Sequence, residues 1–567
     1  MFPTPLHAAA ARAVGELAGV DAEQLKVEVA PRAELGDLAI GCFAIAKQKG
    51  GNPAQHAQQI AAAFTANEWF ASATAAGPFV NFRAARPAVL RWLVEATARG
   101  ELLPAPGAGQ TIVIDYSSPN VSKHLAYHHI RSTMIGHALV QIFRALGYTV
   151  VGLNHLGDWG TTHGNLLEAW RLWGPKDAGA TVDVALLNEL YVKFSAAAKD
   201  DPAIKEAGRA AFKRLEDGDP ALRALWEKFR AVSLAEYQAV YDLLGVSFDV
   251  VKGESEYVPD VPRVLAELAA KGLSSASEGA LVVQLAGDKT PLMLVKDDGA
   301  TTYATRDIPS AVFRWDTWHF TRSLYVVDRG QSLHFKQLFA TLRLMGYEWA
   351  ARCEHIPFGL VQIGGKKGSS RAGNVVLLKD VVAQAEDGVR ALIGQLGALD
   401  DATRDVIAHE VGAGAVVFAN LVAQRDKDVD FDWDRVIALQ GDSGPYVQYN
   451  HARCASIVRK AGAPAGDVDF SKLSTEAEWA VARKLLDFPA AVIAATPKCE
   501  PHIVCHYLLE LAGEFSRWYT AGNTDPALRV LTDDLPVRAA RLALVGAVQA
   551  TLARGLQLLG MAAPQQM

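Results

Sequence analysis

The chain has 567 residues, of which 50% are hydrophobic and 21% charged, a composition typical of a soluble protein with several domains. Lys and Arg number 56 against 62 Asp and Glu, and the net charge of −6 excludes a wholly basic surface that coats nucleic acid. Five scattered cysteines without metal-ligand spacing predict reduced thiols and no protein-bound metal. Without a signal peptide or a bilayer-spanning apolar run, we expect a cytoplasmic monomer that does not contact membranes.

Residues 1–105 are predicted to form a small α/β domain. Segments with helical spacing, ARAVGEL and NPAQHAQQIAAAF, alternate with the strand-like segments LKVEVA and FVNFRA. The following ELLPAPGAGQ carries two Pro and two Gly, which is typical of a linker. We therefore expect a domain boundary near residue 108.

Residues 108–390 are predicted to form a Rossmann-type α/β domain around a doubly wound parallel sheet. The apolar strand TIVIDYSSPN stops at a turn, the helical HHIRSTMIGHALVQIFRALGY follows, and YTVVGLNHLGDWG reads as the next strand. Ligands in such sheets bind at the carboxyl ends of the strands. A mostly helical insertion is expected at about 165–290, a connecting helical segment at 391–440, and an all-α domain at 441–567.

The first candidate site lies where the strand ends and the helix begins. Histidines and a cation beside helix N-terminal amides favour a phosphate site, and an imidazolium or Lys there would offset charge that develops during phosphoryl transfer. The alternative is a helix start with ordinary surface histidines. The candidates are Asp115, Ser118, Asn120, Lys123, His124, His128, His129 and Arg131.

The second candidate is a loop rich in Gly, Lys and Ser, between a strand and the apolar run VVLL. Glycines let the backbone approach phosphates, and Lys and Arg supply positive charge. The loop lacks the Walker A pattern, so a solvated basic loop remains the alternative. Its candidates are Gly365, Lys366, Lys367, Ser369, Ser370 and Arg371.

A third candidate joins Tyr303 and Asp307 with Gln331 and His334, a set that suits a small polar ligand. Taken singly, each of these residues could be structural. If the fold brings Asp115 and Asp307 together, two carboxylates would suit a cation such as a guanidinium, which they can bind bidentately.

Several ordered segments resemble the arginyl-tRNA synthetases, a family of class I aminoacyl-tRNA synthetases. They are ELGDLAIGCFAIAK, DYSSPNVSKHLAYHHIRSTMIGH, NHLGDWGTTHG, TTYATRDIPSA, YVVDRGQSLHF, HIPFGLVQ with KKGSSRAGNVVLL, and DSGPYVQYNHAR. The resemblance covers nearly the whole chain. It implies that the substrate arginine is surrounded by Asp115, Asn120, Tyr303, Asp307 and Gln331.

The resemblance also implies where ATP binds. The HIGH-type signature falls on residues 126–129, where Ala126 replaces the first histidine and His128 the glycine; in the KMSKS-type loop Ser370 replaces the second lysine. The implied ATP-binding residues are Ser118, His124, His128, His129, Gly365, Lys366, Lys367, Ser369 and Ser370. The implied catalytic residues are Lys123, His128, His129, Lys367 and Arg371.

The implied reaction has two steps, in which arginine attacks the α-phosphate of Mg²⁺-ATP and the adenylate is passed to tRNA(Arg). The N-terminal domain is expected to touch the corner of the tRNA, and the C-terminal domain to read the anticodon. Candidates on the first C-terminal helix are Tyr446, Tyr449, His451 and Arg453, with interdomain packing as the alternative.

Two rival hypotheses remain at this point. A catalytically impaired paralogue that binds tRNA in a regulatory role would account for Ala126. A synthetase for another amino acid is the second, but an uncharged substrate would fit poorly beside Asp115 and Asp307.

Overall fold

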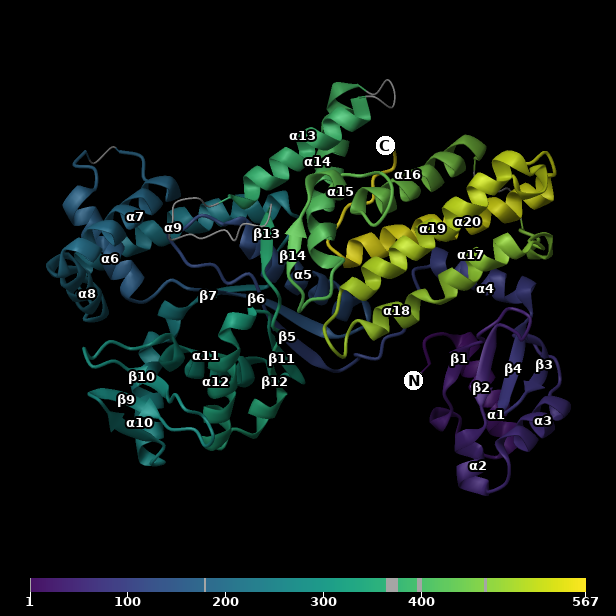
Figure 1. Cartoon of the computed structure of the whole chain (residues 1–567), viewed down its shortest axis with the longest axis horizontal. Coiled ribbons are helices and arrows are strands. Elements are labelled where there is room, and N and C mark those ends of the chain that lie inside the picture. The colour runs from purple at the N-terminus through teal and green to yellow at the C-terminus, as the bar shows by residue number, and fades with distance from the viewer. Residues whose placement is uncertain (1, 178–179, 364–375, 395–399, 463–466) are drawn as a thin grey trace.

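The computed structural model describes residues 2–177, 180–363, 376–394, 400–462 and 467–567. An N-terminal domain, a central α/β region and a C-terminal helical bundle follow one another along the chain (Figure 1).

The N-terminal domain is built on a four-stranded antiparallel sheet in the order β1-β2-β4-β3. Its first helix begins at a Thr4 cap followed by Pro5, and α3 begins in the same way at Asn52 and Pro53, because Pro fits the first helical turn. The elements are α1 Pro5–Ala18, β1 Val27–Val29, β2 Leu38–Gly41, α2 Phe43–Lys49, α3 Pro53–Ala63, β3 Phe70–Ala76, β4 Phe79–Ala84 and α4 Arg86–Ala98.

The central sheet is parallel, in the order β12-β11-β5-β6-β7, which confirms the predicted fold class. Its strands are β5 Thr111–Asp115, β6 Thr149–Leu156, β7 Val250–Gly253, β11 Arg322–Tyr325 and β12 Cys353–His355. From β5 the chain continues outward to β6 and β7 on one side, and later to β11 and β12 on the other. The point where the strand order reverses therefore lies between β5 and β11, and ligands bind at such a point.

The segment expected as a mostly helical insertion, about 165–290, contains in its described residues five helices and also short strands. Four helices follow β6, namely α6 Thr161–Trp173, α7 Val184–Asp200, α8 Pro202–Glu216 and α9 Pro220–Leu243. The chain then returns to the central sheet as β7, whose four residues are too few to show a periodic signal in the sequence. After α10 Val261–Ala270, the strands β8 Ser274–Ser277, β9 Ala280–Val283 and β10 Leu292–Val295 form a small antiparallel sheet.

The remaining helices of the α/β region cover the central sheet, and the rest of the chain is mostly helical. The elements are α5 Ile130–Ala145, α11 Tyr303–Trp318, α12 Ser332–Leu344, β13 Val361–Ile363, α13 Leu378–Gly394, α14 Asp401–Leu421, β14 Val429–Phe431, α15 Trp433–Val436, α16 Gly444–Ala461, α17 Glu476–Leu486, α18 Phe488–Ala494, α19 His502–Thr524 and α20 Leu535–Leu558. Between the two larger parts, β13 pairs with β14 in parallel.

Helix α20 is long and apolar enough to cross a bilayer by length and composition, but half of its most apolar window is buried within the protein. It packs against α16, α19, α4 and α5, and its buried side chains belong to the largest apolar core. A buried core helix satisfies the same criteria, so this helix is weak evidence for a membrane span.

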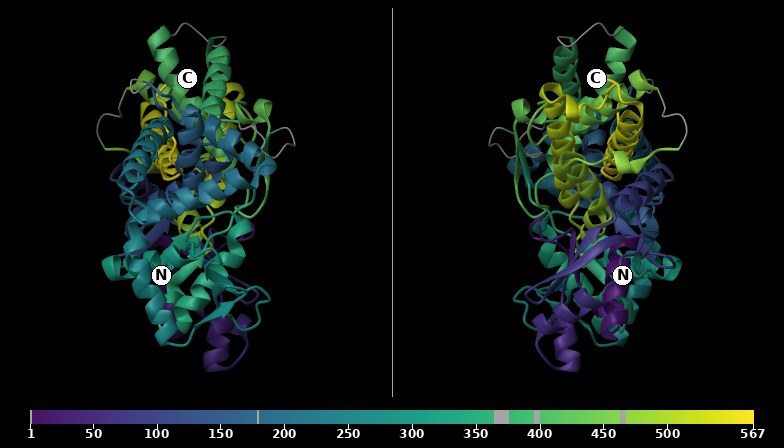
Figure 2. Two further views of the ribbon diagram at one scale, coloured as in Figure 1. Left: turned by 90° about the vertical axis from the view of Figure 1, so that its left-hand side faces the viewer. Right: turned by 90° about the vertical axis from the view of Figure 1, so that its right-hand side faces the viewer.

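The first domain docks onto the last one (Figure 2). Asp37 accepts hydrogen bonds from the Ala84 N–H at 2.8 Å and from the Trp479 indole N–H at 2.7 Å. The guanidinium of Arg86 pairs with Glu476 at 2.7 Å and lies over the Trp479 ring. One apolar core runs through both domains and α5, and α5 itself packs against α14 and α20.

Candidate active site

A cavity of about 790 Å³ opens where the carboxyl ends of β5 and β11 meet. It lies at the point where the strand order reverses, as the sheet topology requires. The structure brings together at its walls nine of the candidates selected from the sequence: Asp115, Ser118, Asn120, His128, His129, Tyr303, Asp307, Gln331 and His334.

The turn that leaves β5 has an unusual backbone. Ser117 and Ser118 have φ angles of 71° and 48°, a left-handed conformation that costs energy for residues with a side chain. Hydrogen bonds hold it: Ser117 N–H donates to Ser132 Oγ at 3.0 Å, and Ser118 N–H to Asn154 Oδ1 at 3.1 Å. The turn thereby directs the following residues across the carboxyl end of the sheet.

Asp115 is already paired inside the protein. Its Oδ2 accepts from Arg314 Nη2 at 2.7 Å, its Oδ1 accepts from Ser118 Oγ at 2.8 Å, and both members of the ion pair are buried. The Arg314 guanidinium also lies 4.6 Å from the centre of the Tyr325 ring. Despite burial, the contact with Tyr325 and the charge of Asp115 hold the pKa of Arg314 above its usual value. The expectation that Asp115 offers a free negative charge to a cationic ligand is therefore corrected.

Asp307 differs from Asp115 in its partners. Its Oδ2 accepts from His334 Nε2 at 2.7 Å, and its Oδ1 lies 3.6 Å from His155 Nε2. Among the described residues it forms no ion pair with Lys or Arg. Burial favours the protonated acid, but the nearby His155 and the hydrogen bond to His334 outweigh burial and hold the pKa of Asp307 well below its usual range. A carboxylate at the cavity wall, beside the ring of Tyr303, suits a guanidinium.

The histidines at the helix start are uncharged. Burial lowers the pKa of His129 to about 3, and it also lowers the pKa of His128. His129 Nδ1 accepts from the Ala126 N–H at 3.0 Å, and the two rings lie 4.1 Å apart. The expectation of an imidazolium beside a phosphate is therefore wrong for this pair, which presents neutral rings to the cavity.

Two other candidates from the same segment do not line the cavity. The Lys123 ammonium lies 4.9 Å from the centre of the Tyr191 ring, and His124 Nδ1 is 2.6 Å from Glu236 Oε1 on α9. Both side chains thus contact the helical insertion. The catalytic role of Lys123 and the ATP-binding role of His124 therefore stay predictions, and in this structure the two side chains lie against the insertion and not at the cavity wall.

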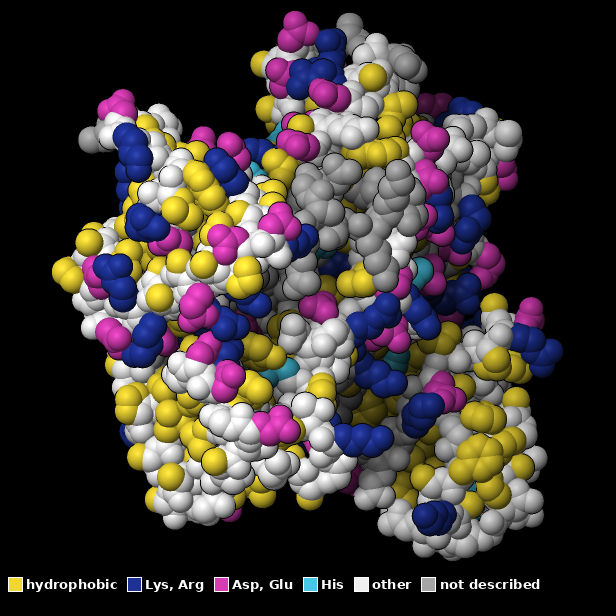
Figure 3. All heavy atoms as spheres, turned by 60° about the vertical axis from the view of Figure 1, so that its left-hand side comes forward, with side chains coloured by type: hydrophobic (Ala, Val, Ile, Leu, Met, Phe, Trp, Pro, Cys, Tyr) yellow, Lys and Arg dark blue, Asp and Glu magenta, His cyan; other side chains and the backbone are white. Residues whose placement is uncertain are grey.

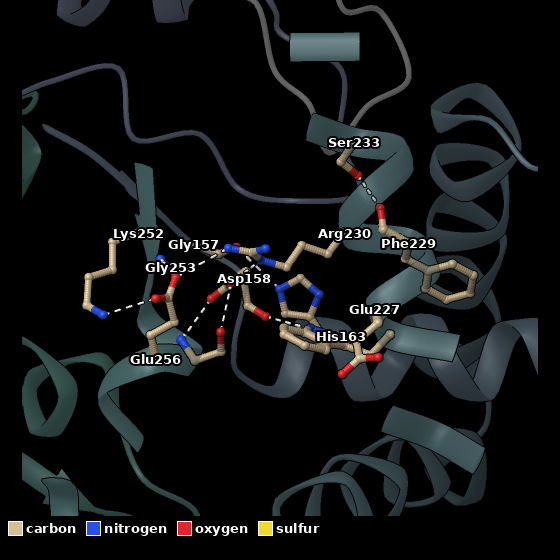
Figure 4. Close-up of polar contacts among 12 residues, drawn as sticks. Gly157, Asp158, His163, Glu227, Phe229, Arg230, Ser233, Lys252, Gly253 and Glu256 are labelled. Carbon is tan, nitrogen blue, oxygen red and sulfur yellow. Dashed lines mark hydrogen bonds and ion pairs between the residues drawn. The ribbon is translucent and has the colours of Figure 1, made fainter. Parts of the chain in front are cut away.

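A buried network around Asp158 fixes the segment after β6 (Figure 4). The Asp158 carboxylate is fully buried and accepts from Arg230 Nε at 2.9 Å, Ser255 N at 2.8 Å and Ser255 Oγ at 2.9 Å. The neighbouring Gly157 forms a parallel bridge with Asn120. Arg230 belongs to α9, so the helical insertion holds this wall of the cavity in place.

The candidates Gly365, Lys366, Lys367, Ser369, Ser370 and Arg371 lie outside the described residues. The chain that leads to them contributes residues 358–361 to the cavity wall.

The candidate tRNA-binding residues on α16 separate into two groups. His451 is buried, and its Nδ1 is 2.9 Å from the carbonyl oxygen of Pro564, so the packing alternative holds for it and its RNA-binding role is corrected. Tyr446 is half-buried. Tyr449 and Arg453 line a hollow of about 480 Å³ together with Arg459, Lys460, Tyr519 and Arg529. This hollow combines cations with aromatic rings, which is typical of a site for unstacked bases.

The cavity residues that the sequence analysis missed include His155, Glu254, Arg314 and Tyr325. Glu254 pairs with Arg306 at 2.7 Å, and each of the others contacts Asp115, Asp307 or Arg314. The signal that could have found His155 was its place at the end of a predicted strand in NHLGDWG. Arg314 lies inside a helix, where the sequence gives no sign of a long-range partner.

Comparison with known proteins agrees with this site. Residues 93–433 match the catalytic domain of the class I tRNA synthetases of the arginine type. Residues 5–84 match the arginyl-tRNA synthetase N-terminal domain, and residues 447–567 match the DALR anticodon-binding domain.

Curated relatives span the full length. An arginine–tRNA ligase of Exiguobacterium sp. (strain AT1b) is 41% identical over 99% of this chain and 98% of its own. One from Clostridium botulinum (strain Alaska E43) is 38% identical over 97% of each. The solved arginyl-tRNA synthetase of Thermus thermophilus has a TM-score of 0.82 and 28% identity, covering 99% of both chains. The chain therefore belongs to the arginyl-tRNA synthetase family, within the class I aminoacyl-tRNA synthetases.

Proposed function

We propose that the protein ligates L-arginine to tRNA(Arg), with ATP as the energy source and arginyl-adenylate as the intermediate. The observation that carries this proposal is Asp307, a carboxylate at the wall of the cavity that no Lys or Arg of the described chain neutralises. The membership of the chain in the arginyl-tRNA synthetase family agrees with this proposal. A buried negative charge at that position requires a cation, and the planar donors of a guanidinium fit it best.

Within this proposal, Tyr303, Asp307, Gln331 and Asn120 surround the substrate arginine. All four line the same cavity. Asp115 acts indirectly, because its pairing with Arg314 and Ser118 fixes the end of β5. The substrate guanidinium then meets the carboxylate of Asp307, whose own partners are histidines.

ATP is proposed to bind beside the 3₁₀ turn η2 Tyr127–His129 and the start of α5. Ser118, His128 and His129 are at the cavity there. His128 and His129 act as neutral groups that pack and form hydrogen bonds. Mg²⁺ enters as the complex with ATP. The positive charge for the phosphates is assigned to Lys366, Lys367 and Arg371, and Gly365, Ser369 and Ser370 belong to the same loop.

The reaction requires little covalent chemistry from the side chains of the protein. The arginine carboxylate attacks the α-phosphorus in line and pyrophosphate leaves; a ribose hydroxyl of the tRNA then attacks the adenylate carbonyl, and AMP leaves. The rate enhancement comes from holding both substrates in one cavity and from stabilising the charge of the phosphates.

For the tRNA, we propose that the anticodon loop meets the hollow at Tyr449 and Arg453, and that the N-terminal domain touches the outer part of the molecule. The hollow offers aromatic rings and cations at one place. On the face in Figure 3, Lys and Arg are interspersed with Asp and Glu, so the contact depends on local patches and not on net charge. All five cysteines are buried and free, which supports a cytoplasmic location.

Aminoacylation of total tRNA with labelled arginine tests the proposal. We expect charged tRNA that depends on ATP. We also expect Asp307→Asn to raise the KM for arginine at least about 30-fold, since losing one member of a buried charge pair costs about 2–5 kcal/mol. Asp217→Asn, in an exposed pair with Lys213, is the matched control and should leave the KM unchanged.

Two results would overturn the proposal. The absence of charged tRNA despite measurable tRNA binding would favour the regulatory paralogue. Charging with another amino acid would reject arginine as the substrate.

A further inference from the structure

The carboxylate of Asp307 is held between two imidazoles that come from different elements. His334 lies in the first turn of α12 and His155 near the end of β6, with Nε2 atoms 2.7 Å and 3.6 Å from the two carboxylate oxygens. Their side chains are only 8% and 12% exposed, while that of Asp307 is 19% exposed. A carboxylate accepts about four hydrogen bonds, so capacity remains on the side that faces the cavity.

The other charged groups around this cluster have partners or are neutral. From β5, Asp115 faces Arg314 of α11 at 2.7 Å, and in the 3₁₀ helix η3 Glu254–Asp260, Glu254 faces Arg306 at 2.7 Å. Before the 3₁₀ helix η4 Arg329–Gln331, Asp328 accepts from the Gly330 N–H at 2.7 Å.

The neighbouring aromatic groups also carry no charge near neutral pH. Burial raises the pKa of Tyr257 to about 12, and it raises the pKa of Tyr303 and Tyr325. At η2, burial keeps His128 neutral. Asp307 therefore carries a local negative charge that, within the described part of the chain, no Lys or Arg balances, so a proton on the neighbouring histidines or a cation from outside is needed beside it.

We propose that His155 and His334 make arginine recognition an exchange of cations, in which the empty site keeps a proton on this histidine pair and the substrate guanidinium displaces it. The inference rests on the proposed function of the cavity. The proton leaves an imidazole N–H for the solvent, and each neutral imidazole keeps one N–H directed at Asp307. The guanidinium then takes the free side of the carboxylate.

The electrostatics of His155 support this exchange. Burial disfavours its charged form, but the nearby Asp307 carboxylate at 3.6 Å and the charge of Asp115 outweigh burial, so the pKa of His155 lies above the usual value. As pH falls, more of the empty site holds the proton, and arginine must displace it. The Kd for arginine therefore rises with falling pH, by up to about tenfold per pH unit for one linked proton.

The exchange also selects the substrate. An uncharged side chain of similar length would leave the proton in place and meet an imidazolium. An ammonium brings the charge but lacks the planar fork that occupies two acceptor sites at once. His155 and His334 are thus specificity-determining residues that act through Asp307.

Calorimetric titration of the full chain with L-arginine tests the exchange. Titrations from about pH 6 to about pH 8.5, each in phosphate and in Tris, give the number of protons released, because the two buffers differ in ionisation enthalpy. We expect release approaching one proton per arginine at the acid end and less at the alkaline end, with a Kd that falls as pH rises.

Variants identify the histidine that carries the released proton. His155→Gln and His334→Gln each keep an N–H donor for Asp307 but cannot take up a proton. We expect at least one of them to lower the proton release and flatten the pH profile, with the Kd at pH 8.5 within about threefold of the unaltered protein. His409→Gln is the control, since His409 pairs with Glu386 in the connecting helices and should change neither quantity.

The outcomes separate the two proposals. Arginine binding without proton release, at a Kd independent of pH, would overturn the exchange and leave the proposed function intact. Unchanged release in both glutamine variants would also overturn it. No arginine binding at any pH would overturn the proposed function itself. If a variant does not fold, the two-buffer titration of the unaltered protein still decides.

Discussion

Gly157, at the end of β6, allows Asn120 to approach the sheet. A β-carbon at Gly157 would lie 2.3 Å from Asn120 Oδ1, closer than real contacts allow. The two residues also form a backbone bridge, so the Asn120 side chain would have to rotate away from its present position to relieve this contact. The position of this candidate arginine-binding residue therefore depends on a neighbour that has no side chain.

Gly157→Ala should displace Asn120 and raise the KM for arginine about 10-fold or more in ATP–pyrophosphate exchange, since small misplacements of positioning groups are costly. The loss of stability should stay within about 1–3 kcal/mol, the usual range for an overpacked site. Gly546→Ala in α20 is the control, because a β-carbon there meets nothing within 4 Å. A KM unchanged in Gly157→Ala would remove Asn120 from the arginine site.

At the scale of one element, α9 supports the turn that follows β5. Ser233 Oγ accepts from the Ser122 N–H at 2.9 Å, and Tyr237 Oη donates to the carbonyl oxygens of Asn120 and Lys123, both at 2.7 Å. Tyr241 Oη is 2.8 Å from Ser117 Oγ. Residues 233, 237 and 241 recur every four positions and so share one face of the helix. The helical insertion thus fixes the strained turn that carries Ser118 and Asn120.

Removing one hydroxyl from this face should affect catalysis more than folding. Tyr237→Phe leaves two carbonyl groups without their donor, which costs about 1–3 kcal/mol of stability. We expect the rate of adenylate formation to fall at least about 10-fold as the turn loosens. The measurement is ATP–pyrophosphate exchange beside urea unfolding. Tyr347→Phe, which loses a bond to Glu267 away from the cavity, should keep the normal rate.

Much of this site could be predicted from the sequence, and the parts that could not be predicted share a physical cause. The strand, the Ser-Ser-Pro-Asn turn and the following helix are local, so pattern and turn chemistry predict them, and Asp307 follows from residue type and position. The face of α9 and the Asp115–Arg314 pair join residues more than 100 positions apart. Burial of His451 likewise depends on the far end of the chain.

Considered as a whole, the molecule buries several histidines in neutral form. Burial lowers the pKa of His7, His137 and His163 to about 4 and that of His129 to about 3. The unfolded chain takes up these protons near pH 6.5, while the folded chain does not. Stability is therefore lost as pH falls from about 6.5 toward 4, whereas His155, with its raised pKa, acts in the opposite sense.

We expect the urea midpoint to fall clearly between pH 7 and pH 5, since each neutral histidine contributes up to about 1.4 kcal/mol per pH unit in that window. Tryptophan fluorescence can follow the transition. His409→Gln, at a half-exposed position, should show the same pH dependence as the unaltered chain. A midpoint that does not move between the two pH values would contradict the prediction.

The contact between Asp37 and Trp479 has a consequence for synthesis. The two partners are 442 positions apart, so the N-terminal domain emerges from the ribosome long before the helix that receives it. At about 5–20 residues per second, the delay is roughly 20–90 s. During this time the face around Asp37 is exposed to solvent, and the domain must hold its own sheet together. The last fifth of the chain to be translated thus completes the site onto which the N-terminal domain docks.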